Sequence, residues 1–241
     1  MLVFQAPTWQ MNPTITRESL QEEFDKDSAF AMMEWGAEFA DVVDAFFISD
    51  KVVACVDKKR PNILPHASSR TRYVVTLDPG LKGNAYALAM GHFEKPKVIA
   101  DYLRLWQGTR ENPVQIVEVE DFLLGLNRKY RIVDNALDQH QSAATIQRLQ
   151  KKIHIRETVF TASYNVEIYQ CLLELVNMGH FRAPVYEPLT TEMKFLQRIQ
   201  LSNRFRVEPA QGYTADLADC VANLSYILVV EHEKGGGVFV P

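Results

Sequence analysis

The chain has 241 residues, of which 47% are hydrophobic and 23% are charged, and its net charge is −4. This length and composition are those of a globular protein with one substantial core. Three widely spaced cysteines in no CxxC pattern argue against a disulfide framework or a zinc site. No apolar run is long enough to span a bilayer. The negative charge excludes a surface that attracts nucleic acid as a whole, so any DNA contact must use local basic patches.

The first 70 residues differ from the rest of the chain in their sequence pattern. Ser19 and Glu22 have the spacing of a capping box at the start of a helix. The polar, proline-containing stretch 57–69 has the composition of a linker. We therefore predict that residues 1–70 form a mainly helical segment ahead of the main domain. At the other end, the glycine-rich residues 233–241 predict a flexible tail.

From residue 71 to residue 232 the pattern is that of an α/β domain. Apolar runs over 73–78 and 84–92, separated by a Gly/Pro turn, predict a β-hairpin. Further strands are expected over 97–106, 130–134, 153–160 and 204–207, and helices over 113–127, 141–152, 166–178, 188–200 and 214–231. Three strands followed by alternating helices and strands predict a mixed β-sheet flanked by helices.

Aspartates occur at the ends of the predicted elements. Asp78 ends the first apolar run, where an ionised carboxylate costs several kcal/mol to desolvate unless it is paired or binds a cation. Asp134 ends another predicted strand, and Asp216 and Asp219 lie three apart at the start of the last helix, on one side of it. If the two strands are neighbours, Asp78 and Asp134 meet at one edge of the sheet.

Clustered carboxylates normally ionise together only around a cation. Oxygen ligands favour Mg²⁺ or Mn²⁺ over zinc, and two such ions about 3.5–4 Å apart can clamp the attacking and leaving oxygens of a phosphodiester. Each acid also has an ordinary interpretation, because Asp78 can cap a turn, Asp134 can form an Asx turn and Asp216 can be a charge at a helix N-terminus. The order of the acids along the chain favours the metal site.

That order resembles the ribonuclease-H-like nucleases, and most of all the nuclease domain of the large terminase subunit of tailed bacteriophages. The resemblance covers nearly the whole chain. The motifs similar to that family are Leu77-Asp78-Pro79-Gly80 with Gly83-Asn84-Ala85-Tyr86-Ala87, Ile132-Val133-Asp134, Ala215-Asp216-Leu217-Ala218-Asp219, and, in the leading segment, Trp9, Asn12-Pro13 and Glu34-Trp35-Gly36-Ala37-Glu38-Phe39.

The resemblance implies a ribonuclease-H-like fold and a metal-dependent endonuclease. Such an enzyme cuts concatemeric viral DNA during genome packaging with little sequence preference, leaving 5′ phosphate and 3′ hydroxyl ends. Asp78, Asp134 and Asp216 are the expected catalytic ligands of two Mg²⁺ or Mn²⁺ ions, supported by Asp138 and Asp219. Asp138 is the alternative second acid, since a helical turn after the strand would let it face the metal. Asp219 is the alternative third acid.

The resemblance also implies partners and a context. These are double-stranded DNA, the small terminase subunit and the portal protein, in the host cell cytoplasm during viral assembly. The chain contains no G-x-x-x-x-G-K-[ST] phosphate loop, so the motor is missing from it. We therefore interpret residues 1–70 as a remnant of the motor or linker segment in a piece of a longer protein.

Basic residues near the predicted site are candidates for DNA contact. Each can equally be a solvated surface charge or, for the histidine, a residue at a helix start. The candidates are Lys82, His140, Lys151, Lys152, Arg198, Arg204 and Arg206, the last two flanking Phe205.

Three other functions remain open. A nuclease related to Holliday-junction resolvases would share the acids but prefer branched DNA. An actin- or hexokinase-like ATP-binding protein begins with a similar Asp-x-Gly hairpin, although its second phosphate turn is not evident here. A non-catalytic module would bind DNA or the portal with the acids incidental, and metal-independent binding without cleavage would support it.

Overall fold

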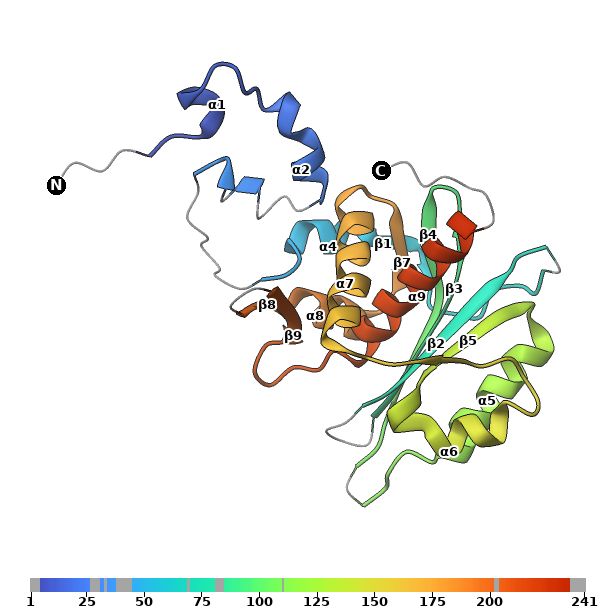
Figure 1. The fold of residues 1–241 in the computed structure, drawn as a ribbon. Helices are drawn as coiled ribbons and strands as arrows, with labels where there is room; N and C mark the ends of the chain where they lie inside the picture. Colours follow the sequence, from blue (N-terminus) through green and yellow to red (C-terminus); the bar gives the residue numbers. More distant parts are fainter. Residues whose placement is uncertain are drawn as a thin grey trace.

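The computed structural model describes residues 5–26, 31–32, 34–37, 45–68, 70–80, 85–109, 111–201 and 204–234 (Figure 1). The helices in these parts are α1 (Thr8–Met11), a 3₁₀ turn (Glu18–Leu20), α2 (Gln21–Lys26), α4 (Ser49–Cys55), α5 (Ile116–Lys129), α6 (Gln139–Leu149), α7 (Ala162–Asn177), α8 (Glu187–Lys194) and α9 (Asp216–Lys234). The strands are β1 (Val56–Pro61), β2 (Tyr73–Gly80), β3 (Ala85–Glu94), β4 (Lys97–Gln107), β5 (Ile132–Asp138), β6 (Arg156–Thr158), β7 (Phe181–Val185), β8 (Leu196–Leu201) and β9 (Arg204–Pro209).

A seven-stranded mixed sheet forms the centre of the molecule, in the order β1-β7-β4-β3-β2-β5-β6. The strands β2, β3 and β4 are antiparallel, as expected for consecutive hairpin-connected strands. On the two sides, β5 pairs parallel with β2 and β7 pairs parallel with β4, each entering after a helix. The predicted mixed sheet flanked by helices is confirmed. A separate hairpin, β8–β9, lies beside it.

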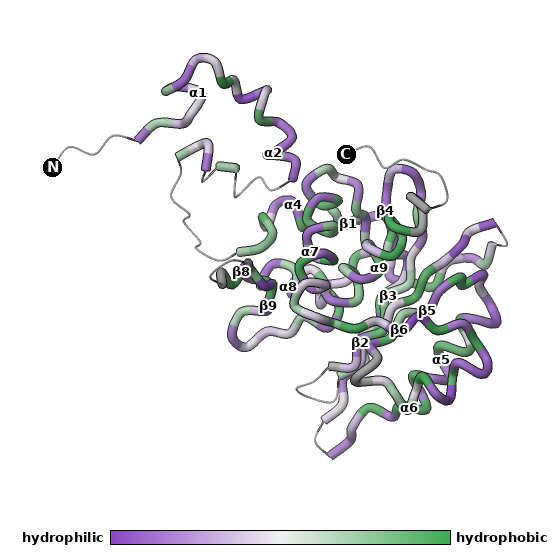
Figure 2. The backbone as a smooth tube through the Cα atoms, in the orientation of Figure 1, coloured by the Kyte–Doolittle hydropathy of each residue, from purple (hydrophilic) through white to green (hydrophobic). Residues whose placement is uncertain are grey.

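Helices cover both faces of the sheet (Figure 1). One face packs against α4, α7, α8 and α9, and the other packs against α5 and α6. The central strands are buried on both faces, so consecutive residues such as Val74 and Val75 belong to opposite hydrophobic clusters. The hydropathy colouring shows these strands and the inner sides of the helices as largely hydrophobic (Figure 2).

Three sequence predictions fail in detail. The strand predicted to end at Asp134 continues to Asp138, because Ala136 and Leu137 still pair with β2. The helix predicted over 188–200 ends at Lys194, because the following residues pair with β9 as β8. The stretch 57–69, expected to be a linker, begins with residues of the strand β1, which was not predicted.

The domain boundary expected near residue 70 does not separate the sheet from all of the residues before it. β1 is an edge strand of the seven-stranded sheet and pairs parallel with β7. The residues Phe46, Phe47, Val52 and Cys55 belong to the hydrophobic core on one face of that sheet. A smaller cluster of Leu20, Phe24 and Ala31 holds the earlier helices together. Residues 235–241, most of the predicted tail, lie outside the described part of the chain, and α9 includes 233 and 234. None of the described helices is both long and apolar enough to cross a membrane.

Candidate active site

Two aspartates lie at the carboxyl ends of neighbouring parallel strands, Asp138 as the last residue of β5 and Asp78 two residues before the end of β2. Leu77 of β2 and Leu137 of β5 are the last residues of these strands that pair in register, and Asp78 and Asp138 follow them directly. Parallel strands bring their carboxyl ends to the same edge, which in open α/β sheets is where ligands bind. The second acid at this edge is therefore Asp138, four residues beyond the one that we favoured from the sequence.

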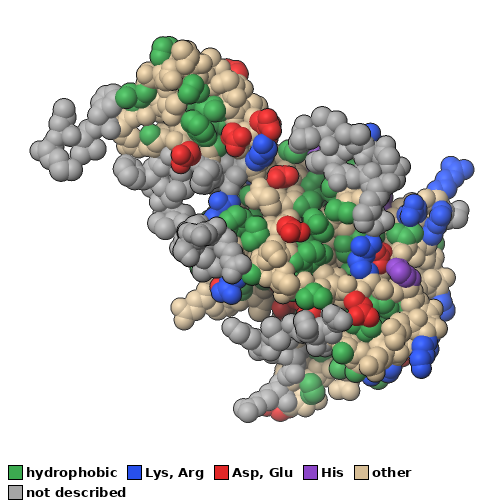
Figure 3. Space-filling view, viewed as in Figure 1, with side chains coloured by type: hydrophobic (Ala, Val, Ile, Leu, Met, Phe, Trp, Pro, Cys, Tyr) green, Lys and Arg blue, Asp and Glu red, His purple; other side chains and the backbone are tan. Residues whose placement is uncertain are grey.

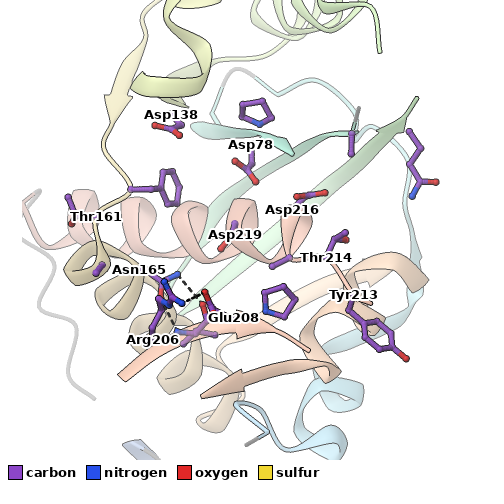
Figure 4. Close-up of a pocket in the computed structure, with 18 of the residues that line it drawn as sticks. Asp78, Asp138, Thr161, Asn165, Arg206, Glu208, Tyr213, Thr214, Asp216 and Asp219 are labelled. Carbon is purple, nitrogen blue, oxygen red and sulfur yellow. Dashed lines mark hydrogen bonds and ion pairs between the residues drawn. The ribbon is translucent and has the colours of Figure 1, made fainter. Parts of the chain in front are cut away.

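The beginning of α9 supplies two further acids. Asp216 is its first residue and Asp219 lies one turn on, where both project from the same side. Helix α9 packs against β2 and β3, which brings this turn to the strand ends. Figure 4 shows the side chains of Asp78, Asp216 and Asp219 facing a common space, with Asp138 on the other side of Asp78.

All four aspartates line one open pocket with a volume of about 1070 Å³. Its other walls come from the end of β4, from the start of α7, from β9 and from the turn before α9. Arg206 and Glu208 of β9 and Tyr213 of that turn are among the residues that line it. On the face drawn in Figure 3, acidic and basic side chains are interspersed, in agreement with the modest net charge.

The carboxylates of this pocket perturb one another. Desolvation, followed by repulsion from Asp219 and Asp216, raises the pKa of Asp78 well above its ordinary value. Desolvation also raises the pKa of Asp219 to about 7, although the hydroxyl of Tyr169 donates a 2.7 Å hydrogen bond to its carboxylate and opposes the shift. The pKa of Asp216 is raised by desolvation. A cation would remove this repulsion.

A buried glutamate holds the start of α9 in place. The carboxylate of Glu192, on α8, accepts hydrogen bonds from the backbone N–H groups of Leu217 (2.8 Å) and Ala218 (2.9 Å) and from the hydroxyl of Thr214 (2.9 Å). These are N–H groups that a helix N-terminus leaves without partners inside the helix. The side chain is 5% exposed, and desolvation raises its pKa to about 7. Glu192 thus fixes the turn that carries Asp216.

A side-chain hydrogen bond also joins the two acid-bearing elements. The buried hydroxyl of Thr76, two residues before Asp78, donates to the carbonyl of Cys220 at 2.8 Å. Cys220 follows Asp219 directly. This hydrogen bond therefore links strand β2 to helix α9 close to Asp78 on the strand and to Asp219 on the helix.

Asp134 lies away from this pocket. Its carboxylate is buried and forms an ion pair with Arg156, and His154 Nε2 lies 3.6 Å from it. It pairs in register with Val74, four positions before Asp78 on β2. The structure thus gives Asp134 a partner on β6 and does not bring it together with the other acids.

The predicted DNA contacts are scattered. Lys82 lies outside the described residues, as do the side chains of His140 and Arg204. Lys151 and Lys152 are exposed after α6, and the guanidinium of Arg198 lies over the rings of Phe46 and Phe205. Of the predicted contacts whose side chains are described, only Arg206 lines the pocket, where it pairs with Glu208 at 2.5 Å.

The sequence analysis missed Glu192, Tyr169 and Tyr213. No motif marks them, because Glu192 lies in an ordinary helical stretch and Tyr169 in an apolar helix face. Tyr213 had a weak signal, an aromatic residue after Gly212 immediately before the acidic helix.

The donor set fits a divalent cation in kind and in charge. All four ligand candidates are carboxylates, the oxygen donors that Mg²⁺ and Mn²⁺ prefer. Among the described residues that line the pocket, Arg206 is the one basic side chain, so their negative charge is poorly balanced. No three His, Cys, Asp or Glu side chains in the described ranges are already close enough to hold an ion. Carboxylates that repel one another without a cation are expected to stand apart in this way.

Among the comparisons with known proteins, the one with solved structures shows the fold. No family model matches the chain, and no curated protein sequence does. The large terminase nuclease of thermophilic phage G20c with bound magnesium is 11% identical, with a TM-score of 0.62 over 76% of this chain and 97% of that one. The nuclease domain of Thermus phage P74-26 is 10% identical, with a TM-score of 0.58 over 74% of this chain and 93% of that one.

A longer protein extends the comparison. The large terminase of another thermophilic bacteriophage is 10% identical, with a TM-score of 0.61 over 92% of this chain and 55% of that one. This chain therefore corresponds to about half of that longer terminase. At such identities the likeness is one of fold. The chain has the ribonuclease-H-like fold of the large terminase nucleases.

Proposed function

We propose that the chain is a divalent-metal-dependent endodeoxyribonuclease. The observation that carries the proposal is the convergence of Asp78, Asp138, Asp216 and Asp219 on one pocket, in a fold shared with terminase nucleases. The raised pKa of Asp78, caused first by desolvation and then by repulsion from Asp219 and Asp216, supports it, because a bound cation offsets both effects. G20c nuclease structures with bound magnesium and with bound cobalt support the choice of a divalent ion.

The chain's own residues have the following roles in this proposal. Asp78 and Asp138 hold the ions from the sheet, and Asp216 and Asp219 hold them from α9. When bound, two such ions lower the pKa of a water and stabilise the leaving oxygen of a phosphodiester. Glu192 keeps Asp216 in position, and Tyr169 orients the carboxylate of Asp219 by its hydrogen bond. Arg206 in the pocket wall is suited to a DNA phosphate.

The proposed substrate is double-stranded DNA, cut with little sequence preference. The larger setting is the cleavage of concatemeric viral DNA during packaging, with the small terminase subunit and portal as partners. Of residues 1–70, those ahead of Phe46 would then be the end of a motor or linker segment, because Phe46 and the strand β1 already belong to the core and sheet of the nuclease fold. This setting is inferred from the fold alone.

Cleavage of supercoiled plasmid tests the proposal. Wild-type protein is incubated with Mn²⁺, with Mg²⁺ and with EDTA, beside Asp78→Asn and the matched control Asp121→Asn, an exposed aspartate on α5. We expect nicking and linearisation with a divalent ion, loss of both in EDTA and in Asp78→Asn, and no change in Asp121→Asn. Wild-type protein that is folded, binds DNA and cuts with neither ion would favour the docking module. A strong preference for a four-way junction over linear duplex would favour the resolvase-like nuclease.

A further inference from the structure

Two exposed aromatic rings stack at the wall of the acidic pocket. The rings of Phe195 and Tyr213 are 3.8 Å apart between centroids and 10° from parallel. Phe195 is 39% exposed and Tyr213 is 40% exposed, although both are large and hydrophobic. Tyr213 is among the residues that line the pocket and Phe195 is not, so one ring of the stacked pair belongs to the pocket and the other supports it.

The backbone holds this pair firmly. Ala210 N–H donates to the carbonyl of Phe195 at 2.8 Å, and Tyr213 N–H donates to the carbonyl of Ala210 at 3.0 Å. Between them, Gly212 has φ +89°, a conformation that residues with a side chain rarely adopt. The two rings are thus joined through one tight turn, and the Tyr213 ring is preorganised. A preorganised ring loses little conformational entropy when a ligand binds.

Tyr213 lies close to the acids along the chain. It precedes Asp216 by three residues, which span at most about 11 Å even when fully extended. Arg206 lines the same pocket, where it pairs with Glu208, and a phosphate that displaced Glu208 would gain this cation as its partner. The pocket thus combines three features that suit a nucleic-acid strand. The carboxylates suit the metal ions at the phosphodiester that is cut, and Arg206 suits a phosphate. The aromatic ring matches a base, since every base has a π-face that stacks on aromatic side chains.

We propose that Tyr213, supported by Phe195, is a stacking surface for a nucleobase beside the acids, so that the strand is held with one base out of the duplex stack. This inference rests on the proposed nuclease function and specifies its substrate as DNA with an unstacked nucleotide at the cut. A base inside a regular duplex presents only its edges and cannot cover the ring. DNA with an unpaired nucleotide therefore binds better than a fully paired duplex.

Fluorescence of 2-aminopurine tests the inference separately from cleavage. A short duplex with one unpaired 2-aminopurine is titrated with protein in Ca²⁺, with DNA integrity checked on a gel, and anisotropy of an end label gives the affinity. The variants are Tyr213→Ala and the matched control Tyr213→Phe, which keeps the ring. We expect quenching with wild type and Tyr213→Phe but not with Tyr213→Ala. We expect Tyr213→Ala to bind this DNA about 5- to 150-fold more weakly, the equivalent of about 1–3 kcal/mol for one stacked base.

The controls separate the two proposals. Binding of the fully paired duplex is expected to change less than about twofold in Tyr213→Ala, and melting temperatures establish that each variant is folded. Equal quenching by Tyr213→Ala and wild type would overturn the stacking surface, as would equal losses in Tyr213→Ala and Tyr213→Phe. Plasmid cleavage in Mn²⁺ is measured in parallel. Cleavage without differential quenching rejects the stacking surface alone, and quenching without cleavage rejects the nuclease alone.

Discussion

Asp78 and Asp138 each follow directly on Leu77 and Leu137, which are the last residues that pair in register between the parallel strands β2 and β5. This arrangement depends on backbone hydrogen bonds in the interior of the sheet. A slip of one residue in either strand would move each of its side chains to the opposite face of the sheet. The backbone positions of these two aspartates are therefore set by the sheet. Adjustment to a bound ion is left to the side chains and to the acids on α9.

The two aspartates of β5 are expected to behave oppositely. Asp138→Asn removes a carboxylate of the pocket, so we expect plasmid cleavage to fall at least about 100-fold. Loss of a residue that only hydrogen-bonds to a metal ligand already lowers activity by up to about 100-fold, and loss of a ligand itself should cost at least as much. Asp134→Asn is expected to leave cleavage within about threefold and to lower the free energy of unfolding by about 1–3 kcal/mol, because Arg156 loses its charged partner. Cleavage rates and urea denaturation measure the two effects. The reverse order of activities would restore Asp134 as the second acid.

Divalent ions are expected to stabilise the protein through the same acids. An ion that binds the folded state alone adds about 2.7 kcal/mol to the free energy of unfolding at a hundredfold excess over its Kd. Melting temperature is measured against Mn²⁺ and Mg²⁺ concentration for wild type, Asp78→Asn and the surface control Asp121→Asn. We expect a rise in wild type and in the control, and a much smaller one in Asp78→Asn. A rise of equal size in all three proteins would place the ion elsewhere.

Removal of the Glu192 carboxylate is expected to harm both stability and activity. Glu192→Ala leaves the N–H groups of Leu217 and Ala218 without their acceptor, which costs about 1–3 kcal/mol for a buried group. The start of α9 then loosens, and we expect cleavage to fall at least about tenfold as Asp216 loses its position. Glu187→Ala, an exposed change on the same helix, is the matched control. An unaltered cleavage rate in a clearly destabilised Glu192→Ala would mean that the cap serves stability alone.

The same residue predicts a pH dependence of stability. Burial raises the pKa of Glu192 from 4.5 to about 7, so between these pH values the folded state keeps a proton that the unfolded state has lost. The free energy of unfolding of the metal-free protein therefore falls as the pH rises from about 4.5 to about 7.

Glu192→Gln cannot lose this proton, which makes it the comparison protein. We expect its stability relative to wild type to improve as the pH rises across that window. Denaturant titrations in EDTA at closely spaced pH values measure the difference. A difference that is constant with pH would contradict the raised pKa.

Much of the fold could be predicted from local patterns. The hairpin around Asp78, the strand β4 and the helices α5, α6 and α7 have clear periodicity, and Gly179 ends α7 with φ +68° as a C-cap glycine does. The strand β1 could not be predicted in this way, because its sequence Val-Asp-Lys-Lys-Arg-Pro is polar and suits only the edge of a sheet.

The acids show where local pattern fails. Both Asp134 and Asp138 follow apolar residues, and only the pairing with β2 decides which of them ends the strand. Asp134 then finds Arg156 on β6, a contact between residues 22 positions apart that no spacing rule reveals. Glu192 is similar, since a glutamate on a short helix is usually exposed, and its burial results from the packing of α8 against α9. Asp78, Asp216 and Asp219 could be proposed as site residues from the sequence because each lies at or within one turn of the boundary of a strongly patterned element.

The bond from Thr76 to the carbonyl of Cys220 has a practical consequence, because it places a thiol at the joint between β2 and α9. Cys220 is 1% exposed and burial raises the pKa of its thiol well above the ordinary value, so it cannot react with alkylating reagents while α9 stays closed on the sheet. Cys55, buried in the same core but next to β1, reports on opening at the far edge. The labelling rate of Cys220, compared with that of Cys55, thus measures how often α9 separates from β2 relative to opening of the sheet near β1.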